Sequence, residues 1–359
     1  AAVSRELLLC DGEGRAVTRR LTCLGLPRWA LRVGATREHL LLLDAERPAV
    51  LLLPLAGLRA LASGGACDPQ RPPVHRLALA SRDPPYAGLL LGDRLYLSFF
   101  SSNRVELHRL RAGATPRLEL ERVVRFPAPE NLGLSDLALH GGELVVAATG
   151  YRCFARHCPG GRFGEGRLFF LSASGEPRGP GLATANRNPA GLYTHAPTGV
   201  TYLLSAGELE GGHGSLERLL GSRRLGPPLR LARGAATARA FPLGLRDLAL
   251  LAFAGDRLTI VDAYRDRLRA VLRFDGRALR AIPPHTPVPD RRRADLQDLV
   301  PLGGEEHLLL DSQNDQLVRL RYRERNASAS VTARTPLRAG RARAGPSWAF
   351  WLERARPGR

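Results

Sequence analysis

The sequence has no methionine and no lysine, few aromatic residues and only five cysteines among its 359 residues. No apolar run approaches the ~18 residues that a membrane-spanning helix needs, and the longest, such as residues 40–43, ends after a few positions. We therefore expect no transmembrane segment within this sequence, so that the chain is soluble or anchored by something outside it. Because Met is missing even at position 1 and the chain opens on Ala1 and Ala2, we expect an exported chain whose signal peptide has been removed. A trimmed start is the alternative.

The charge is strongly one-sided. All 53 basic residues are arginines, and against 34 acidic residues they leave a formal net charge of +19. Such a charge attracts acidic partners through a field that salt screens. The arginines are spread along the chain, and no basic helix, zinc-finger spacing or aromatic nucleic-acid signature accompanies them, which disfavours nucleic-acid binding. We therefore expect an acidic protein or an acidic envelope polymer as the partner.

Four of the cysteines fall into two candidate disulfide pairs. Cys153 and Cys158 flank a short loop, and Cys10 and Cys23 lie on neighbouring strand-like segments. Both pairs suit an oxidising compartment. Free thiols are one alternative. Another is a partial metal site of Cys153, His157 and Cys158, although this spacing matches no zinc motif.

A unit of roughly fifty residues recurs along the chain. Segments 133–139, 244–250 and 296–302 share an Asp-Leu step among apolar residues, and each is followed by a short turn and a second apolar run. The runs are short, rich in Leu and Val, and separated by Gly, Asp and Asn. That composition is typical of strands and turns. A period of about 40–50 residues with four short strands predicts a β-propeller.

We therefore predict an all-β chain that folds as a single β-propeller domain over residues 1–359. Six repeat centres fall near positions 39, 88, 136, 191, 246 and 297. About one further repeat remains, split between the two ends, so we expect seven four-stranded blades, with six as the alternative. Residues 1–28 and 336–359 would share the closing blade, which removes an open sheet edge. A pair of β-sandwiches is the alternative fold.

The repeated unit resembles the blades of NHL/YVTN-type β-propellers. The resemblance lies in an Asp-Leu step, a turn, a strand such as Leu95-Tyr96-Leu97, an Asp- or Asn-rich turn and a Val-x-x-Leu strand. It covers nearly the whole chain as a pattern. It implies a fold and no fixed activity, because this scaffold carries enzymes, receptors and scaffold proteins.

The resemblance also implies where chemistry would occur. In such propellers the first strand of each blade lines a central channel, so Asp136, Asp247 and Asp298 would lie at the channel-side starts of three first strands. We expect a partial ring of carboxylates at one mouth, able to bind a divalent cation or a basic group. The alternative is structural, with each carboxylate accepting loop N–H groups and locking neighbouring blades.

Two loops on the expected mouth face are extended, at residues 151–166 and 207–214. Long loops on a rigid scaffold are where binding residues commonly lie. These loops carry the candidate binding residues Arg152, Arg156, His157, Arg162 and His213. We expect His140 and His195, which follow first strands at the opposite face, to lie in exposed turns.

Catalytic motifs are missing from the sequence. It has no Gly-x-Ser-x-Gly elbow, no His-Glu-x-x-His and no haem-attachment motif. We therefore predict a non-catalytic binding or scaffold protein of the cell envelope, periplasmic or extracellular, that presents a basic, loop-rich propeller face to its acidic partner. The alternative is a hydrolase-like or lactonase-like propeller enzyme, or a metal-binding protein, with its site at the channel mouth.

A third hypothesis concerns the C-terminal tail. Residues 339–359 contain Trp348, Phe350 and Trp351, an aromatic cluster of the kind that anchors one protein on another. The tail could therefore dock this chain on a neighbouring subunit of a larger assembly. Its alternative role is the closing strand of the last blade.

Overall fold

The structure is a computed structural model. It describes residues 2–3, 6–10, 17–21, 23–27, 30–66, 68, 74–111, 113, 115–126, 132–153, 162–195, 197–207, 215–221, 223–227, 249–254, 257–262, 267–274, 279–281, 296–303, 305–311, 314, 316–323, 328–337 and 346–348.

Residues Trp29–Ala249 form one compact unit. It contains four antiparallel sheets of four strands each, and every sheet takes its strands in chain order. The strands are β4 (Ala30–Ala35), β5 (His39–Asp44), β6 (Ala49–Pro54), β7 (His75–Ala78), β8 (Ala87–Leu91), β9 (Arg94–Phe99), β10 (Arg104–Arg111), β11 (Arg117–Arg125), β12 (Leu134–His140), β13 (Glu143–Ala148), β14 (Arg167–Leu171), β15 (Leu182–Ala183), β16 (Pro189–His195), β17 (Val200–Ser205), β18 (Ser215–Leu220) and β19 (Arg224–Leu225).

The core of this unit lies between successive sheets. Every residue of β5, the second strand of its sheet, is buried. Leu97 and Phe99 of β9 pack against the sheet that precedes theirs, in one cluster with Leu41 and Leu52. Val105 of β10 packs against the sheet that follows. The strands are apolar on both faces, and successive sheets therefore pack face to face.

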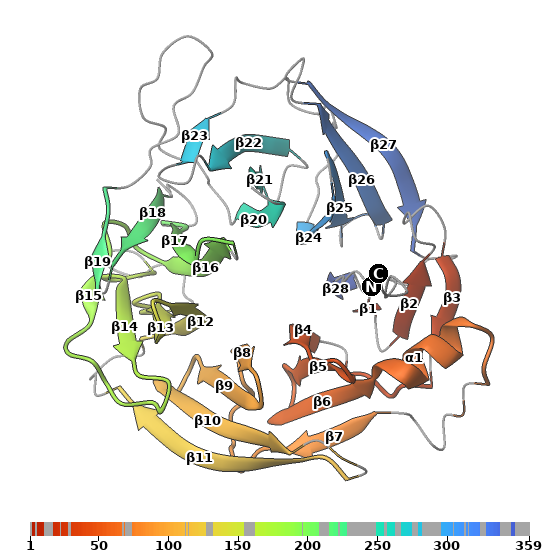
Figure 1. The fold of residues 1–359 in the computed structure, drawn as a ribbon, viewed down its shortest axis with the longest axis horizontal. Coiled ribbons are helices and arrows are strands. Elements are labelled where there is room, and N and C mark those ends of the chain that lie inside the picture. The colour runs from red at the N-terminus through yellow and green to blue at the C-terminus, as the bar shows by residue number, and fades with distance from the viewer. Residues whose placement is uncertain are drawn as a thin grey trace. The chain divides into compact units, whose positions relative to one another are not determined.

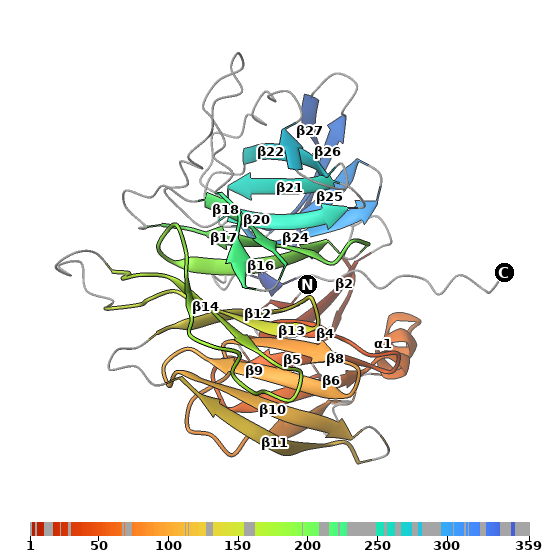
Figure 2. The same cartoon turned by 60° about the vertical axis from the view of Figure 1, so that its left-hand side comes forward.

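The first strand of each sheet lies beside the first strand of the next. The structure brings β4 against β8, β8 against β12 and β12 against β16. Figure 1 shows β8 on the inner side of its sheet and β11 on the outer side, and Figure 2 shows β9, β10 and β11 side by side. This order places the starts of the first strands near the ends of the second strands.

A second compact unit comprises Ala1–Arg28 and Leu250–Arg359. It contains three four-stranded sheets, in the orders β28-β1-β2-β3, β20-β21-β22-β23 and β24-β25-β26-β27. Their bounds are β1 (Ala2–Val3), β2 (Glu6–Cys10), β3 (Val17–Leu21), β20 (Ala249–Ala254), β21 (Arg257–Asp262), β22 (Arg267–Phe274), β23 (Leu279–Ala281), β24 (Leu296–Gly303), β25 (Glu306–Asp311), β26 (Gln316–Arg323), β27 (Ser328–Pro336) and β28 (Pro346–Trp348). In the first sheet Ala2 pairs with Leu7 on one side and Trp348 on the other.

The expected number of blades is corrected by the structure. Five blades of four consecutive strands have both their pairing and their side-chain packing described, in place of the seven or six that the repeats predicted. They are β4–β7, β8–β11, β12–β15, β16–β19 and β24–β27. The other two sheets are defined by backbone pairing, because almost all their side chains lie outside the described residues. The repeat spacing counts apolar runs along the chain and does not show which of them bury their side chains in a blade.

A short helix interrupts the strands. α1 (Leu55–Ala62) follows β6 directly and buries Leu55, Leu58 and Leu61 on one face. That spacing of three puts the leucines on the same side of a helix. Across the described residues, no helix is long and apolar enough to cross a membrane.

Candidate functional site

Asp136 joins the inner strands of two neighbouring blades. It lies near the start of β12, where one carboxylate oxygen, Oδ1, accepts the N–H of Leu137 at 2.8 Å. The other, Oδ2, accepts the N–H of Leu192 in β16 at 2.7 Å. Burial raises the pKa of Asp136 to about 6, although both hydrogen bonds act to lower it. The side chain therefore fastens blade to blade and titrates close to neutrality.

The side chains of the other two predicted channel carboxylates lie outside the described residues. Asp247 lies outside them. Asp298 lies in β24 opposite Leu310, in the other compact unit, and its side chain is not described. Within the described part of the chain, no three His, Cys, Asp or Glu side chains converge as a metal site would require. The carboxylate ring and its divalent cation stay predictions.

The first extended loop is described at its base. Tyr151 and Phe163 form an isolated antiparallel bridge, and the N–H of Arg152 donates to the carbonyl of Arg162 at 2.7 Å. Arg152 is exposed and Arg162 is half-buried. The bridge therefore places two of the predicted arginines side by side on one stem. The predicted binding residues that lie outside the described residues are Arg156, His157 and His213.

Two cysteines engage in disulfides. Cys23 and Cys153 are each disulfide-bonded. Their pairing is not assigned, because the side chains of Cys10, Cys67 and Cys158 lie outside the described residues. The predicted pairs, Cys153 with Cys158 and Cys10 with Cys23, therefore stay predictions.

Four aromatic rings form a continuous row, and two of them belong to the stem formed by Tyr151 and Phe163. The ring centroids of Tyr86 and Phe100 are 4.9 Å apart, those of Phe100 and Tyr151 5.3 Å, and those of Tyr151 and Phe163 6.0 Å. Tyr86 is 48% exposed, whereas Tyr151 and Phe163 are buried. We use the name aromatic–arginine face for the group Tyr86, Phe100, Tyr151, Phe163, Arg152 and Arg162, of which Tyr86 and Arg152 are exposed.

Two tyrosines of the aromatic–arginine face have raised pKa values. Partial desolvation raises the pKa of the Tyr86 hydroxyl, and the charge of Asp136 raises it further. Desolvation also raises the pKa of Tyr151, while Arg162 acts to lower it. Sequence reasoning missed these rings. The available signal was their position, because Tyr86 precedes a first strand, Phe100 and Tyr151 follow second strands and Phe163 precedes a third strand.

Gly133 provides the space that this face needs. Its φ is +62°, a conformation that L side chains rarely adopt. A Cβ atom here would lie 2.3 Å from Oγ1 of Thr149 and 2.9 Å from both Cζ of Phe100 and Cβ of Tyr151. The glycine at the start of the repeated unit therefore permits the rings to close over the backbone before β12.

A buried charged row runs along β10. Nε of Arg104 donates to Oε1 of Glu106 at 2.9 Å, and Nε2 of His108 lies 3.0 Å from Oε2 of the same carboxylate. All three side chains are nearly inaccessible to solvent. Burial alone would raise the pKa of Glu106, but hydrogen bonds from His108 and Arg104 hold it below its ordinary value. The Val-Glu-Leu-His alternation of this strand therefore does not turn its polar side chains toward solvent.

The two histidines expected in exposed turns are buried. His140 is 9% exposed and His195 is 4% exposed. The His140 ring contacts Oγ1 of Thr201 at 3.2 Å and the carbonyl of Gly221 at 2.8 Å, and Nδ1 of His195 lies 2.7 Å from Oγ1 of Thr198. His140 is therefore held by groups of the next blade, whereas His195 is held by a threonine of its own turn.

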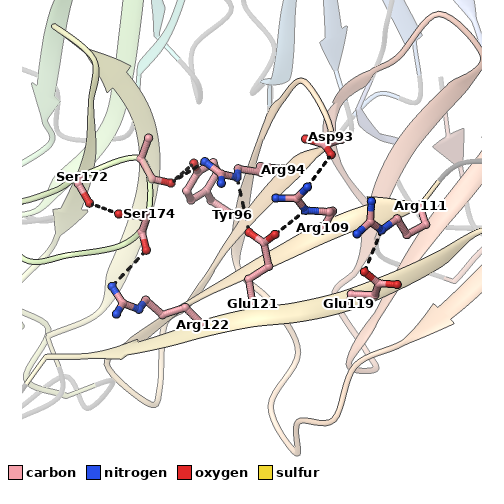
Figure 3. A network of polar contacts seen from close by, with 11 residues as sticks. Asp93, Arg94, Tyr96, Arg109, Arg111, Glu119, Glu121, Arg122, Ser172 and Ser174 are labelled. Carbon is pink, nitrogen blue, oxygen red and sulfur yellow. Dashed lines mark hydrogen bonds and ion pairs between the residues drawn. The ribbon is translucent and has the colours of Figure 1, made fainter.

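A separate polar network fastens the outer part of the β8–β11 blade to the next blade (Figure 3). The hydroxyl of Tyr96 donates to the carbonyl of Ala173 at 2.7 Å. Arg122 donates to the carbonyl of Ser174 at 3.2 Å and pairs with Glu176. These contacts cross from β9 and β11 to the turn after β14. They are structural, and they lie on other elements than the aromatic–arginine face.

A shallow apolar hollow lies on the inner strands. Its volume is about 490 Å³, and Leu89, Leu137 and Leu192 from three successive first strands contribute to its wall. The remaining lining residues are Ala138, Leu139, Gly141, Gly142, Thr194 and Gly199. Its wall carries one polar side chain, that of Thr194, and the described lining offers no ionisable group for chemistry.

Comparisons with known proteins identify the fold. Neither a protein-family model nor a curated protein matches the sequence. Among solved structures, a streptogramin B lyase aligns with a TM-score of 0.57 at 10% identity, over 93% of this chain and 87% of its own. The periplasmic gluconolactonase PpgL of Pseudomonas aeruginosa aligns with a TM-score of 0.56 at 12% identity, over 95% and 97%. A putative 6-phosphogluconolactonase of Bacteroides fragilis aligns with a TM-score of 0.54 at 11% identity, over 92% and 95%.

These structures are β-propellers. The predicted resemblance to β-propellers is therefore confirmed at the level of the fold. Identities of 10–12% carry no activity from those proteins to this chain.

Proposed function

We propose that the chain is a non-catalytic binding protein of the cell envelope, which presents the aromatic–arginine face to an acidic protein or polymer. The observation that carries this proposal is an exposed tyrosine, Tyr86, linked through the rings of Phe100 and Tyr151 to the stem that bears the exposed Arg152 and the half-buried Arg162. Tyrosine and arginine are enriched at binding surfaces, where they supply large contact areas and hydrogen bonds at low entropic cost. A surface of this composition suits an acidic ligand.

The overall charge supports an acidic partner. A net charge of +19 raises the local concentration of anions around the protein. Arg152 and Arg162 would add short-range contacts with an anionic ligand, because a guanidinium can hold a carboxylate or sulfate through two parallel hydrogen bonds. The long-range field would speed the encounter, and the stem would fix where the ligand binds.

Two observations support an envelope location. Cys23 and Cys153 are disulfide-bonded, and disulfides persist mainly in oxidising compartments. The structurally similar PpgL of Pseudomonas aeruginosa is a periplasmic protein. We therefore retain export as part of the proposal.

Heparin affinity chromatography tests the proposal, with heparin as the acidic polymer. The double variant Arg152→Gln/Arg162→Gln should elute at clearly lower salt than the wild type, because it removes the local guanidinium pair. The matched control is Arg111→Gln/Arg117→Gln, which removes two exposed charges near the opposite end of β10 and the start of β11. Equal losses in the two double variants would show a diffuse charge effect and would contradict a defined site.

A propeller enzyme is the second candidate function. Two structural neighbours are named as lactonases, and the carboxyl of Asp136 titrates near neutrality, where a general base works best. Against this role, each oxygen of Asp136 already accepts a backbone N–H. Hydrolysis of glucono-1,5-lactone by the wild type, lost in Asp136→Asn while the fold is kept, would establish the enzyme and displace the binding proposal.

A further inference from the structure

The apolar hollow on the inner strands has one polar side chain in its described wall, that of Thr194. Its volume of about 490 Å³ suits a small molecule, because ligand pockets commonly enclose about 300–1,000 Å³. Leu89, Leu137 and Leu192 come from β8, β12 and β16, so three blades supply the apolar wall. Leu139 adds an apolar side chain that is 37% exposed. The described lining therefore favours an uncharged, mainly apolar ligand.

Thr194 begins a row of hydrogen bonds that leads away from the hollow. Thr194 and Thr201 face each other across β16 and β17, and their hydroxyl oxygens are 3.0 Å apart. The hydroxyl oxygen of Thr201 lies 3.2 Å from Nδ1 of His140, and Nε2 of the same ring lies 2.8 Å from the carbonyl oxygen of Gly221. Thr201 is fully buried and His140 is nearly so. Each group in this row therefore has its partners within the protein.

The carbonyl of Gly221 sets the direction of these hydrogen bonds. A carbonyl can only accept, so Nε2 of His140 carries a proton, and Nδ1 of the neutral ring is an acceptor. Thr201 must then donate its single proton to Nδ1, and it accepts from Thr194. The Thr194 hydroxyl thus donates its own proton to Thr201 and retains its lone pairs. Toward a ligand in the hollow, Thr194 is therefore an acceptor.

We propose that this hollow binds a small, uncharged and mainly apolar molecule that carries one N–H or O–H donor. The donor of the ligand would meet a lone pair of Thr194, whereas an acceptor in the same place would face another oxygen lone pair with no proton between them. The rest of the ligand would lie against the leucines of the wall. The hollow shares no residue with the aromatic–arginine face, so this inference is independent of the proposed function.

Two probes of nearly the same shape test the proposal in ligand-observed NMR titrations at pH 8. Indole carries an N–H donor, whereas benzofuran has an oxygen in that position and no donor. We expect indole to bind about fivefold more tightly than benzofuran, which is the difference that one net hydrogen bond supplies. Leu139→Ala should weaken both probes by a similar factor, roughly threefold, because it removes part of the apolar wall and leaves Thr194 in place.

Substitutions of threonine test the assigned donor and acceptor roles. Thr194→Val keeps the branched shape without the acceptor, and should abolish the preference for indole, whereas Thr194→Ser should retain it. The matched control is Thr198→Val, at an exposed threonine that contacts His195 and is not part of the hollow's described lining, and it should change neither affinity.

Two sets of outcomes would overturn the inference. Equal binding of the two probes to the wild type, or a preference for indole that survives in Thr194→Val, would refute the donor requirement. Absence of binding of both probes, or binding that Leu139→Ala leaves unchanged, would refute the site itself. Unfolding midpoints measured in parallel identify any loss that comes from a damaged fold, and Thr194→Ala replaces Thr194→Val if the latter does not fold.

Discussion

The carboxylate of Asp136 accepts the backbone N–H of Leu192 at 2.7 Å, and so links β12 to β16 across a blade boundary. A second contact reinforces the link, because the hydroxyl of Ser135 donates to the carbonyl of Pro189 at 2.6 Å. Two consecutive side chains thus supply one acceptor and one donor to the next inner strand. Phe100 and Tyr151 of the aromatic–arginine face pack over Gly133, which shortly precedes Ser135 and Asp136 in the chain.

Replacing Asp136 by asparagine should remove a pH dependence of stability. The pKa of Asp136 in the folded protein, about 6, lies above the ordinary 3.8, so the folded state holds the proton more tightly. The stability from this group is therefore full below pH 3.8 and is lost as pH rises through about 6, by at most about 3 kcal/mol. Denaturant unfolding at pH 4 and pH 7 measures it, with Asp93→Asn at an exposed carboxylate as the control. An unchanged difference between the two pH values in Asp136→Asn would refute this role.

Loss of the Tyr96 hydroxyl should loosen the outer joint between blades. Tyr96 is buried, and its hydroxyl donates to the carbonyl of Ala173 at 2.7 Å. Tyr96→Phe should lower the free energy of unfolding by about 1 kcal/mol, since the carbonyl keeps its place but loses this donor. Tyr86→Phe, at an exposed ring, should change stability by a few tenths of a kcal/mol. If thermal unfolding shows the two variants to be equal, the hydrogen bond contributes nothing.

Neutralising two glutamates at matching positions should cost unequal amounts of stability, and the stability from each should depend on pH in the opposite direction. Glu106 is the third residue of β10 and pairs with Leu97, and Glu217 is the third residue of β18 and pairs with Leu203. The partners of Glu106 are Arg104 and His108, whereas Glu217 accepts from the N–H of Ala185 at 3.1 Å and from serine hydroxyls. Burial raises the pKa of Glu217, while that of Glu106 is lowered.

Glu106→Gln should therefore cost about 3 kcal/mol at pH 7, because it removes the buried carboxylate shared by Arg104 and His108 and leaves Arg104 paired with the more exposed Asp83. Glu217→Gln should cost much less, since its partners are neutral donors. The stability from Glu106 is present above its ordinary pKa and is lost as pH falls, and the stability from Glu217 is lost as pH rises. Unfolding curves of both variants from pH 4 to pH 8 test this, and similar costs at neutral pH would be the contrary result.

Alanine at Gly133 should disrupt the aromatic–arginine face. The new Cβ would clash with Thr149, Phe100 and Tyr151, and φ is positive, so we expect a loss of several kcal/mol and an altered near-ultraviolet circular dichroism. Gly141 is the matched control, with φ of +56° and open space around its Cβ position. Gly141→Ala should cost only about 1–2 kcal/mol. Equal losses in the two variants would mean that backbone strain alone, without the rings, explains the effect.

The strands were predictable because their signal is local. The Asp-Leu step at Asp136 and the alternation around Leu107 mark short strands separated by turns, and the structure places β12 and β10 there. The fold class followed from the repeat of such strands. The blade count did not follow, because a repeat interval in the sequence does not show which sheets pack together or how the chain divides into compact units.

The candidate site was predictable only in part. Arg152 and Arg162 were found because a long loop stands out in the sequence. The row of rings was missed, since Tyr86 and Tyr151 are 65 positions apart and only blade packing brings them together. The burial of Glu106 and His108 was not predictable, because alternation shows which residues share a face and not whether a neighbouring blade covers it.

Hydrogen–deuterium exchange in the presence of saturating heparin tests the central claim most directly, because it shows where an acidic polymer binds. We predict slower exchange at residues 84–87, 99–102, 150–153 and 162–164, which carry or flank the aromatic–arginine face, and unchanged exchange in β11. Protection confined to β10 and β11, or no protection at the stem while heparin is bound, would contradict the account.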